Sequence, residues 1–257
     1  MNRKTRERLI VCVAILAIMA LLGLGIIISG TDTETLIPAT SSTEIIINAK
    51  DTSVFITAEE RVDIFVEQHT SRNLQIDRKG ETTTINAEGK GILQLSLPSW
   101  QRIESITVST TSGDIVIDSI MTRSLDLESM TGTMMLTAIS ADKLMAESDS
   151  GNIILTDTYT KLTHIENGTG YIRAIGSIGD IEAEAKAGSI YIVPTGESQI
   201  EATTDSGAIN IIGGERSVYW STSGSVVIRG EEAPSSGGDD EASIKAISGR
   251  GDITISE

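Results

Sequence analysis

The sequence predicts an all-β protein: a parallel β-solenoid of about eight coils with a β-rich N-terminal cap, preceded by one transmembrane helix. Three observations predict this fold. A glycine-containing turn recurs near every 19 residues, apolar residues alternate with other residues on both sides of each turn, and an uncharged apolar run extends from Leu9 to Ile28. A fixed period indicates a repeat architecture, and an apolar run of this length indicates a membrane span.

The apolar run explains the first part of the chain. A helix over its 20 residues rises about 30 Å, the thickness of the hydrocarbon core of a bilayer. The run is longer than the apolar region of a cleaved signal peptide, so we expect an uncleaved anchor over residues 9–29. Four basic residues in the tail over residues 1–8 precede the run, and Asp32 and Glu34 follow it. The positive-inside rule therefore predicts a single-pass protein of the cell membrane with a cytoplasmic N-terminus and an extracellular C-terminal domain.

Charge and cysteine content restrict the function of the outer part. The chain carries a net charge of −16, and residues 31–257 carry −19 because the basic tail contributes +3. A field of this sign excludes nucleic acid as a partner. The only cysteine, Cys12, lies inside the apolar run, so the outer part has no disulfide, cysteine nucleophile or cysteine-based metal site.

The repeat is defined by eight structural turn glycines, which lie 19, 19, 19, 18, 19, 17 and 27 residues apart: Gly113, Gly132, Gly151, Gly170, Gly188, Gly207, Gly224 and Gly251. The residues two and four places after each glycine are apolar in all sixteen cases. The residues seven and five places before each glycine are also apolar, except for Thr163 and Ser217. In the short unit between Gly207 and Gly224, we expect Val218 and Trp220 to face inward instead.

This alternation means two short strands per unit, each with one buried face. Such a unit cannot bury its own apolar face, but stacked units bury a continuous strip. A β-sandwich also alternates, although it does not require one register to recur eight times. The glycine is expected to supply a positive φ or a close approach of the backbone at each corner.

The remaining segments give the domain boundaries. Residues 30–43 are polar and without apolar periodicity, so they are expected to form a linker. Residues 44–99 are an irregular β-rich cap with expected hairpins, and residues 100–257 are the solenoid repeats. Residues 231–243 are expected to be a loop inserted before the last coil.

The order of these parts, with Leu95-Ser96-Leu97-Pro98-Ser99 followed by ITVSTTSGDIVI and a train of SGDI-type turns, resembles the bacterial and archaeal adhesin-like family of unknown function. The resemblance covers residues 44–257 and implies a β-helical domain. It implies no catalytic residues, cofactor or metal.

One outward position forms a candidate site. Four places before the glycine, four successive coils carry glutamate: Glu128, Glu147, Glu166 and Glu184. Asp126, Glu182 and Glu201 flank this acidic ladder on the same face. Stacked carboxylates repel one another unless they are solvated or bridged by cations or by a lysine such as Lys143, Lys161 or Lys186. The ladder is therefore either a solvated face or a site for divalent ions or a cationic peptide.

Other features have simpler interpretations. His69 and His164 are far apart in sequence and are interpreted as solvated surface residues. Arg250-Gly251-Asp252 coincides with a repeat turn, and Asn167 begins an N-glycosylation triplet. An outward apolar stripe marks either β-propensity or a partner surface, and it contains Val116, Met135, Ile154, Tyr191 and Val227, interrupted by Arg173 and Asn210.

The expected function is that of a non-enzymatic adhesin or interaction scaffold, because the repeat positions serve packing and no catalytic constellation converges. Its expected partners are the membrane and a protein or envelope polymer, without a cofactor. The alternative is a membrane-tethered sensor or regulator of the cell envelope, and a polysaccharide-acting enzyme is the least favoured interpretation.

Overall fold

The structure is a computed structural model of the chain. It describes residues 32–38, 43–70, 73–195, 198–213, 217–221, 226–228, 231–233, 236–238 and 244–256. The predicted tail over residues 1–8 and the predicted transmembrane helix over residues 9–29 lie outside these ranges. Within the ranges, no helix has the length and apolar character needed to cross a membrane.

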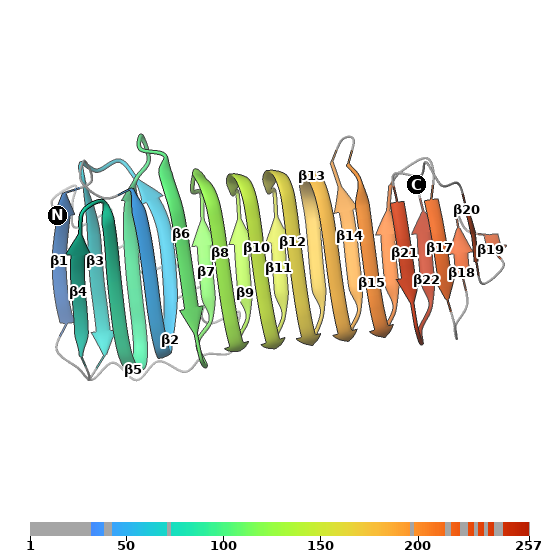
Figure 1. The fold of residues 1–257 in the computed structure, drawn as a ribbon, viewed down its shortest axis with the longest axis horizontal. Coiled ribbons are helices and arrows are strands. Elements are labelled where there is room, and N and C mark those ends of the chain that lie inside the picture. The colour runs from blue at the N-terminus through green and yellow to red at the C-terminus, as the bar shows by residue number, and fades with distance from the viewer. Residues whose placement is uncertain are drawn as a thin grey trace, which may run out of the picture. The chain divides into compact units, whose positions relative to one another are not determined.

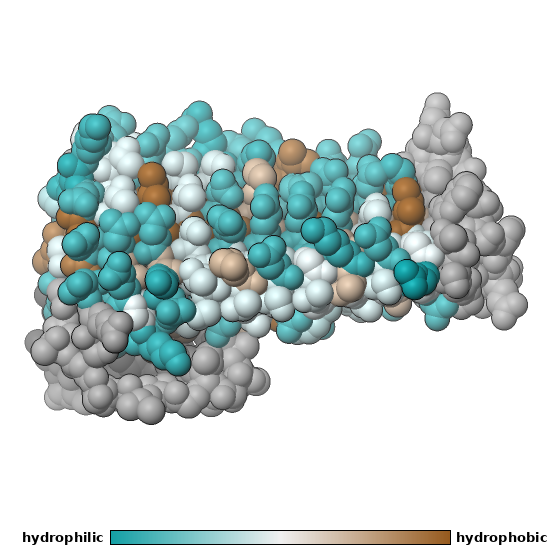
Figure 2. All heavy atoms as spheres, turned by 60° about the horizontal axis from the view of Figure 1, so that its bottom comes forward, coloured by the Kyte–Doolittle hydropathy of each residue, from teal (hydrophilic) through white to brown (hydrophobic). Residues whose placement is uncertain are grey.

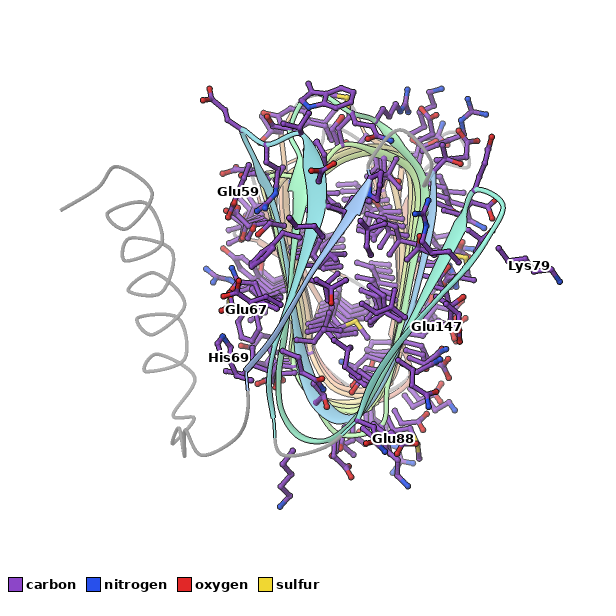
Figure 3. The ribbon with its side chains drawn as sticks, turned by 90° about the vertical axis from the view of Figure 1, so that its left-hand side faces the viewer. Glu59, Glu67, His69, Lys79, Glu88 and Glu147 are labelled. Carbon is purple, nitrogen blue, oxygen red and sulfur yellow. The ribbon has the colours of Figure 1, made fainter. Side chains whose placement is uncertain are left out.

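The described secondary structure consists of 22 strands in one hydrogen-bonded sheet, which confirms the predicted all-β fold. The sheet winds as a flattened coil, so that two walls face each other across a common interior (Figures 1 and 3). Three long strands pass from one wall to the other: β2 (Glu44–Glu59), β5 (Thr82–Pro98) and β13 (Ile172–Ala187).

Layer A is the wall that contains β4 (Leu74–Lys79), β6 (Ile103–Thr110), β8 (Thr122–Thr131), β10 (Ser140–Ser150), β12 (Tyr159–Thr169), β15 (Ile200–Ser206), β17 (Ser217–Ser221), β20 (Ser236–Gly238) and β21 (Ile244–Ser248). Layer B is the opposite wall and contains β1 (Asp32–Pro38), β3 (Asp63–Thr70), β7 (Ile115–Asp118), β9 (Met134–Thr137), β11 (Ile153–Thr156), β14 (Ile190–Pro194), β16 (Ile209–Ile212), β18 (Val226–Ile228), β19 (Glu231–Ala233) and β22 (Ile253–Ser256).

A typical coil shows how the repeat works. Strand β8 crosses layer A, the chain turns at Gly132, and β9 returns through layer B before β10 begins the next coil. Neighbouring coils pair in parallel and in register, so that Leu144 lies between Leu125 and Thr163. The corner that contains Gly132 is called the glycine edge below, and the opposite corner, which contains Ala138, is called the return edge.

The inward residues form the core between the layers. In the coil of β8 and β9, Leu125, Leu127, Met134 and Leu136 are fully buried, and burying each such side chain contributes about 1.5 to 3 kcal/mol. Thr163, the polar exception in the pattern, is also buried, and its hydroxyl is 2.6 Å from that of Thr160. The prediction that Val218 and Trp220 face inward concerns side chains outside the described set. Along the backbone, Ser217 and Tyr219 are in register with Ile244 and Ala246.

Coils approach closely at the glycine edge. A Cβ atom on Gly132 would overlap with the carbonyl oxygen of Gly113 in the preceding coil. The same overlap recurs for each of the next pairs: Gly151 on Gly132, Gly170 on Gly151, Gly188 on Gly170, Gly207 on Gly188 and Gly251 on Gly207. Of these stacked turn glycines, Gly170 and Gly251 have a positive φ. The shared requirement is therefore the missing side chain. Gly224 lies outside the described residues.

The return edge has a different backbone feature, which the sequence did not indicate. One residue per coil adopts the left-handed conformation there, at Ser119, Ala138, Asp157 and Gly176, with φ between 52° and 69°. This conformation costs about 1 to 2 kcal/mol for residues with a side chain, and much less for glycine.

The N-terminal cap is more regular than expected. Both β2 and β5 run through the two layers as complete turns of the coil, and β2 lies between β5 and the first repeat strands β6 and β7. The outer edge of β5 is covered by the antiparallel strands β3 and β4, and β4 and β5 form a hairpin. The expected linker over residues 30–43 contains β1, which pairs with β3 and buries Ile37. Its sequence does not indicate a strand, because the adjacent apolar residues Leu36 and Ile37 give no alternation within an otherwise polar segment.

The C-terminal end also departs from sequence order. Strands β21 and β22, the last in the chain, lie between the coil of β15 and β16 and the coil of β17 and β18. The segment over residues 231–243, expected to be a loop, contains β19 and β20, which pair antiparallel with β18 and β17. The last coil of the sequence therefore lies between two earlier coils of the stack. Short antiparallel strands cover the coil at the end of the stack.

The two edges predict opposite effects of exchanging glycine and alanine within one coil. Gly132→Ala inserts a Cβ against the Gly113 carbonyl and should lower the free energy of unfolding by about 1 to 3 kcal/mol. Ala138→Gly relieves a left-handed alanine and should raise it by about 0.5 to 1 kcal/mol. Urea denaturation of both variants checks this. Two changes of the same sign would contradict the assigned roles of the edges.

Candidate functional site: an acidic groove on layer A

The acidic ladder forms a continuous column on the outer face of layer A. Glu147 of β10 is in register with Glu128 of β8 and Glu166 of β12, and Glu166 is in register with Glu184 of β13. Figure 3 looks along the stack and shows Glu147 outside the ribbon, away from the apolar interior. Parallel neighbours are spaced about 4.8 Å apart. The structure thus brings together the four glutamates singled out in the sequence.

These glutamates line a groove of about 260 Å³ that crosses several coils. The ladder forms one side of the groove, and the residues two places further along each strand form the other, among them Met130, Asp149, Lys186 and Asp205. We call this feature the acidic groove. Figure 2, which turns the lower edge of Figure 1 forward, shows that hydrophilic residues cover most of the described surface and that apolar ones are scattered.

A second column on layer A carries charges of alternating sign. Near the return edge, Arg123 contacts Glu104 at 3.0 Å, and Asp142 is bound by Arg102 at 2.9 Å and by Lys161 at 3.0 Å. The hydrogen bond from Lys161, together with the charge of Arg102, holds the pKa of Asp142 below its ordinary value despite some desolvation. Charges of alternating sign one coil apart therefore neutralise this column, whereas the ladder repeats one sign over four coils.

The column that flanks the ladder carries two basic side chains, Lys245 and His164. Lys245 pairs with Glu201 across adjacent coils. His164 Nε2 lies 2.9 Å from Glu166 and Nδ1 lies 3.1 Å from Glu182. The prediction of a solvated His164 was therefore wrong: its side chain is only 20% exposed and connects the ladder to the flanking column. The cause is parallel stacking, which places Glu182 directly beside it.

Burial lowers the pKa of His164, but the hydrogen bonds and negative charges of Glu166 and Glu182 outweigh this and raise it above its ordinary value. His69, by contrast, lies in β3 of the cap, 3.3 Å from Glu67. The two histidines therefore do not belong to one site.

The arrangement suits separate cationic groups better than a chelated metal. In the described part of the chain, no group of three or more Asp, Glu, His or Cys side chains is arranged to hold a metal ion. Of the three lysines proposed as bridges, Lys161 is bound to Asp142 and Lys186 lies on the opposite side of the groove.

The residue after the turn glycine has a structural role that the sequence analysis did not find. Asp114 Oδ1 accepts a hydrogen bond from the N–H of Thr133 in the next coil at 2.8 Å, and Asn152 Oδ1 accepts one from Tyr171 at 3.2 Å. This explains the aspartate of the SGDI turn. Asp252, in the Arg250-Gly251-Asp252 turn, occupies the equivalent position in the repeat.

A second polar column lies three places before the glycine and faces inward at the glycine edge. Asn167 donates through Nδ2 to the carbonyl of Gly151 at 2.8 Å, and Thr204 donates to that of Gly188 at 3.1 Å. Asn167 is only 3% exposed, so the folded domain does not present it for glycosylation. The recurrence of Ser, Thr or Asn at this position was the available sequence signal.

The apolar stripe also aligns, along the outer face of layer B. Val116, Met135, Ile154 and Arg173 are in register on successive strands. Val116 is buried, Met135 and Ile154 are half-buried, and Arg173 lies over the ring of Tyr191 at 5.9 Å. Val227 lies in β18 with its side chain outside the described set. The described members therefore do not make a large exposed apolar patch.

The winding, the two facing layers and the glycine edge are features that can be compared with known proteins. The sequence profile of the family described as Toastrack DUF4097 matches residues 42–256. The chain belongs to this family. The match confirms the resemblance inferred from the SGDI-type turns. No curated protein matches the chain.

The chain is also similar to solved structures. The chain resembles a "putative adhesin" from Bacteroides fragilis with a TM-score of 0.54 and 16% identity over 90% of this chain and 99% of that one. A "putative adhesin" from Parabacteroides merdae gives 0.49 and 14% over 88% and 96%. A "putative lipid binding protein" from Parabacteroides distasonis gives 0.45 and 13% over 88% and 96%.

His164 predicts a pH dependence of stability. A histidine whose pKa is raised on folding stabilises the folded state fully below its unfolded pKa of about 6.5, and this contribution is lost as pH rises through the folded pKa. His164→Gln should therefore destabilise the domain more at about pH 6 than at about pH 9. Denaturant melts at both pH values provide the measurement. A difference that grows toward alkaline pH would contradict the assigned ion pairs.

Proposed function

We propose that the protein is a non-enzymatic, membrane-anchored solenoid that displays the acidic groove to a cationic partner outside the cell, either a basic protein segment or a cationic envelope polymer. The observation that carries this proposal is the difference between two columns of layer A. The column of Glu104, Arg123, Asp142 and Lys161 alternates in sign, whereas the ladder repeats glutamate in four consecutive coils.

Neither packing nor turn geometry requires this repetition. Outward positions on layer A accept Lys, Arg and Ser elsewhere, and like charges directly opposite one another destabilise paired strands. The domain therefore bears a repulsion that opposite charges would relieve, and a partner with regularly spaced amino groups would provide them. Exposed ion pairs are individually weak, so useful affinity requires several coils to act together.

The anchor supports a position at the cell surface. The apolar run from Leu9 to Ile28 is long enough to cross a bilayer and is preceded by the basic tail, which favours a cytoplasmic N-terminus. The first strand of the sheet begins at Asp32, so the solenoid would lie close to the outer surface. An extracellular location also agrees with a domain that has no cysteine in residues 31–257 to oxidise.

The groove can be tested with a defined polycation. Glu147→Gln combined with Glu166→Gln should weaken binding of the full chain, in detergent, to a lysine-rich peptide by about fivefold, because two exposed ion pairs together contribute about 1 kcal/mol. Stability should change little, because relief of the repulsion within the ladder opposes the loss of the contact between Glu166 and His164. Glu60→Gln with Glu88→Gln removes the same charge from exposed cap residues and should bind like the unaltered chain. Equal loss in both variants, or no binding at all, would leave the ladder as a solvated face.

The anchor is tested separately. The full chain should remain in membranes after alkaline extraction, whereas a chain that begins at residue 32 should be released to the supernatant. Protease added outside intact cells should remove the solenoid and leave the tail protected. Extraction of the full chain by alkali would overturn the anchor without affecting the groove.

A further inference from the structure

Strand β1 lies in series between the apolar run and the solenoid body. Only residues 29–31 separate the end of the run at Ile28 from the start of β1 at Asp32, and β2 begins at Glu44. Any tension between a membrane anchor and the solenoid must therefore pass through β1 before it reaches β2.

β1 is held weakly compared with the strand that follows it. It forms the edge of layer B, and β3 is its only partner among the described strands. Ile37 is its one buried side chain among residues 34–38, while its neighbour Leu36 is 61% exposed. Glu34 lies opposite Glu67 in the register, and Glu67 contacts His69 within β3.

β2 is held on both edges. It pairs with β5 along nearly its whole length, and with β6 and β7 on the other side. Ile45, Ile47, Val54 and Ile56 are fully buried in the core. Removing β2 would require both ladders to break and this apolar surface to be exposed.

The direction of a pulling force determines whether the weaker pairing of β1 leads to its release before β2. When the chain is held at Asp32 and at a contact further along the stack, the line of force turns toward the stack axis, across the strands. β1 is then loaded from its first residue, and its hydrogen bonds break one after another instead of together. At the other end, β21 and β22 are each enclosed by two strands and resist removal as β2 does.

From this arrangement we propose that β1 is a strap that peels reversibly from β3 under tension and lengthens the connection to the membrane while the solenoid stays folded. The inference rests on the proposed membrane anchor and surface role. Release frees residues 32–43, and 12 residues span about 40 Å when extended.

Single-molecule pulling tests the strap. The full chain, with Cys12→Ala, is reconstituted in an immobilised nanodisc and pulled by a tag at its C-terminus. We expect a first, reversible extension of at most about 40 Å at a force below that of the main unfolding event. Ile37→Ala should lower the force of this first event and leave the main one unchanged, because Ile37 belongs to the strap and has already left the core when the main event occurs.

A cross-link provides the matched control. Glu34→Cys with Glu67→Cys places two cysteines at directly opposed positions of an antiparallel pair, where a disulfide can form. Oxidation should abolish the first extension and reduction should restore it. Persistence of the step in the oxidised variant, or main unfolding before any short step, would overturn the strap. A chain that does not enter the nanodisc would overturn the anchor and the strap with it, whereas a lost polycation response would concern the groove alone.

Discussion

The close approach of successive coils at the glycine edge is the constraint on which the rest of the structure depends. The described turn glycines from Gly132 onward each lie over the carbonyl oxygen of the turn glycine in the neighbouring coil, with no room for a Cβ. This contact fixes the register of every coil on its neighbour. Because the register is fixed, inward positions form continuous apolar columns and outward positions form continuous columns of charge.

That register explains how much could be predicted from the sequence. The glycine spacing and the alternation around it specify which residues face the core, and Leu125, Leu127 and their equivalents are buried as the pattern requires. The same reasoning placed the four glutamates in one column, because one position per repeat becomes one line along the stack. The repeat pattern was sufficient to predict the environment of a residue wherever that residue contacts the equivalent residues of neighbouring coils.

Prediction failed where contacts join unlike segments. Nothing in the periodicity indicates that β22 enters between β16 and β18, since any coil presents the same pairing edges. β1 escaped notice because one buried residue, Ile37, makes no alternation. His164 was misjudged because its environment comes from Glu182, which is adjacent in space but 18 residues away in the chain.

The interleaved ends have a consequence for how such a protein can change in length over evolution. A coil added after β22 would have to displace a strand that is enclosed on both sides, so additions at the C-terminal end should be selected against. A duplicated 19-residue unit inserted between β8 and β15 would meet identical neighbours above and below. Relatives of different height should therefore differ in the number of middle coils and share their two ends.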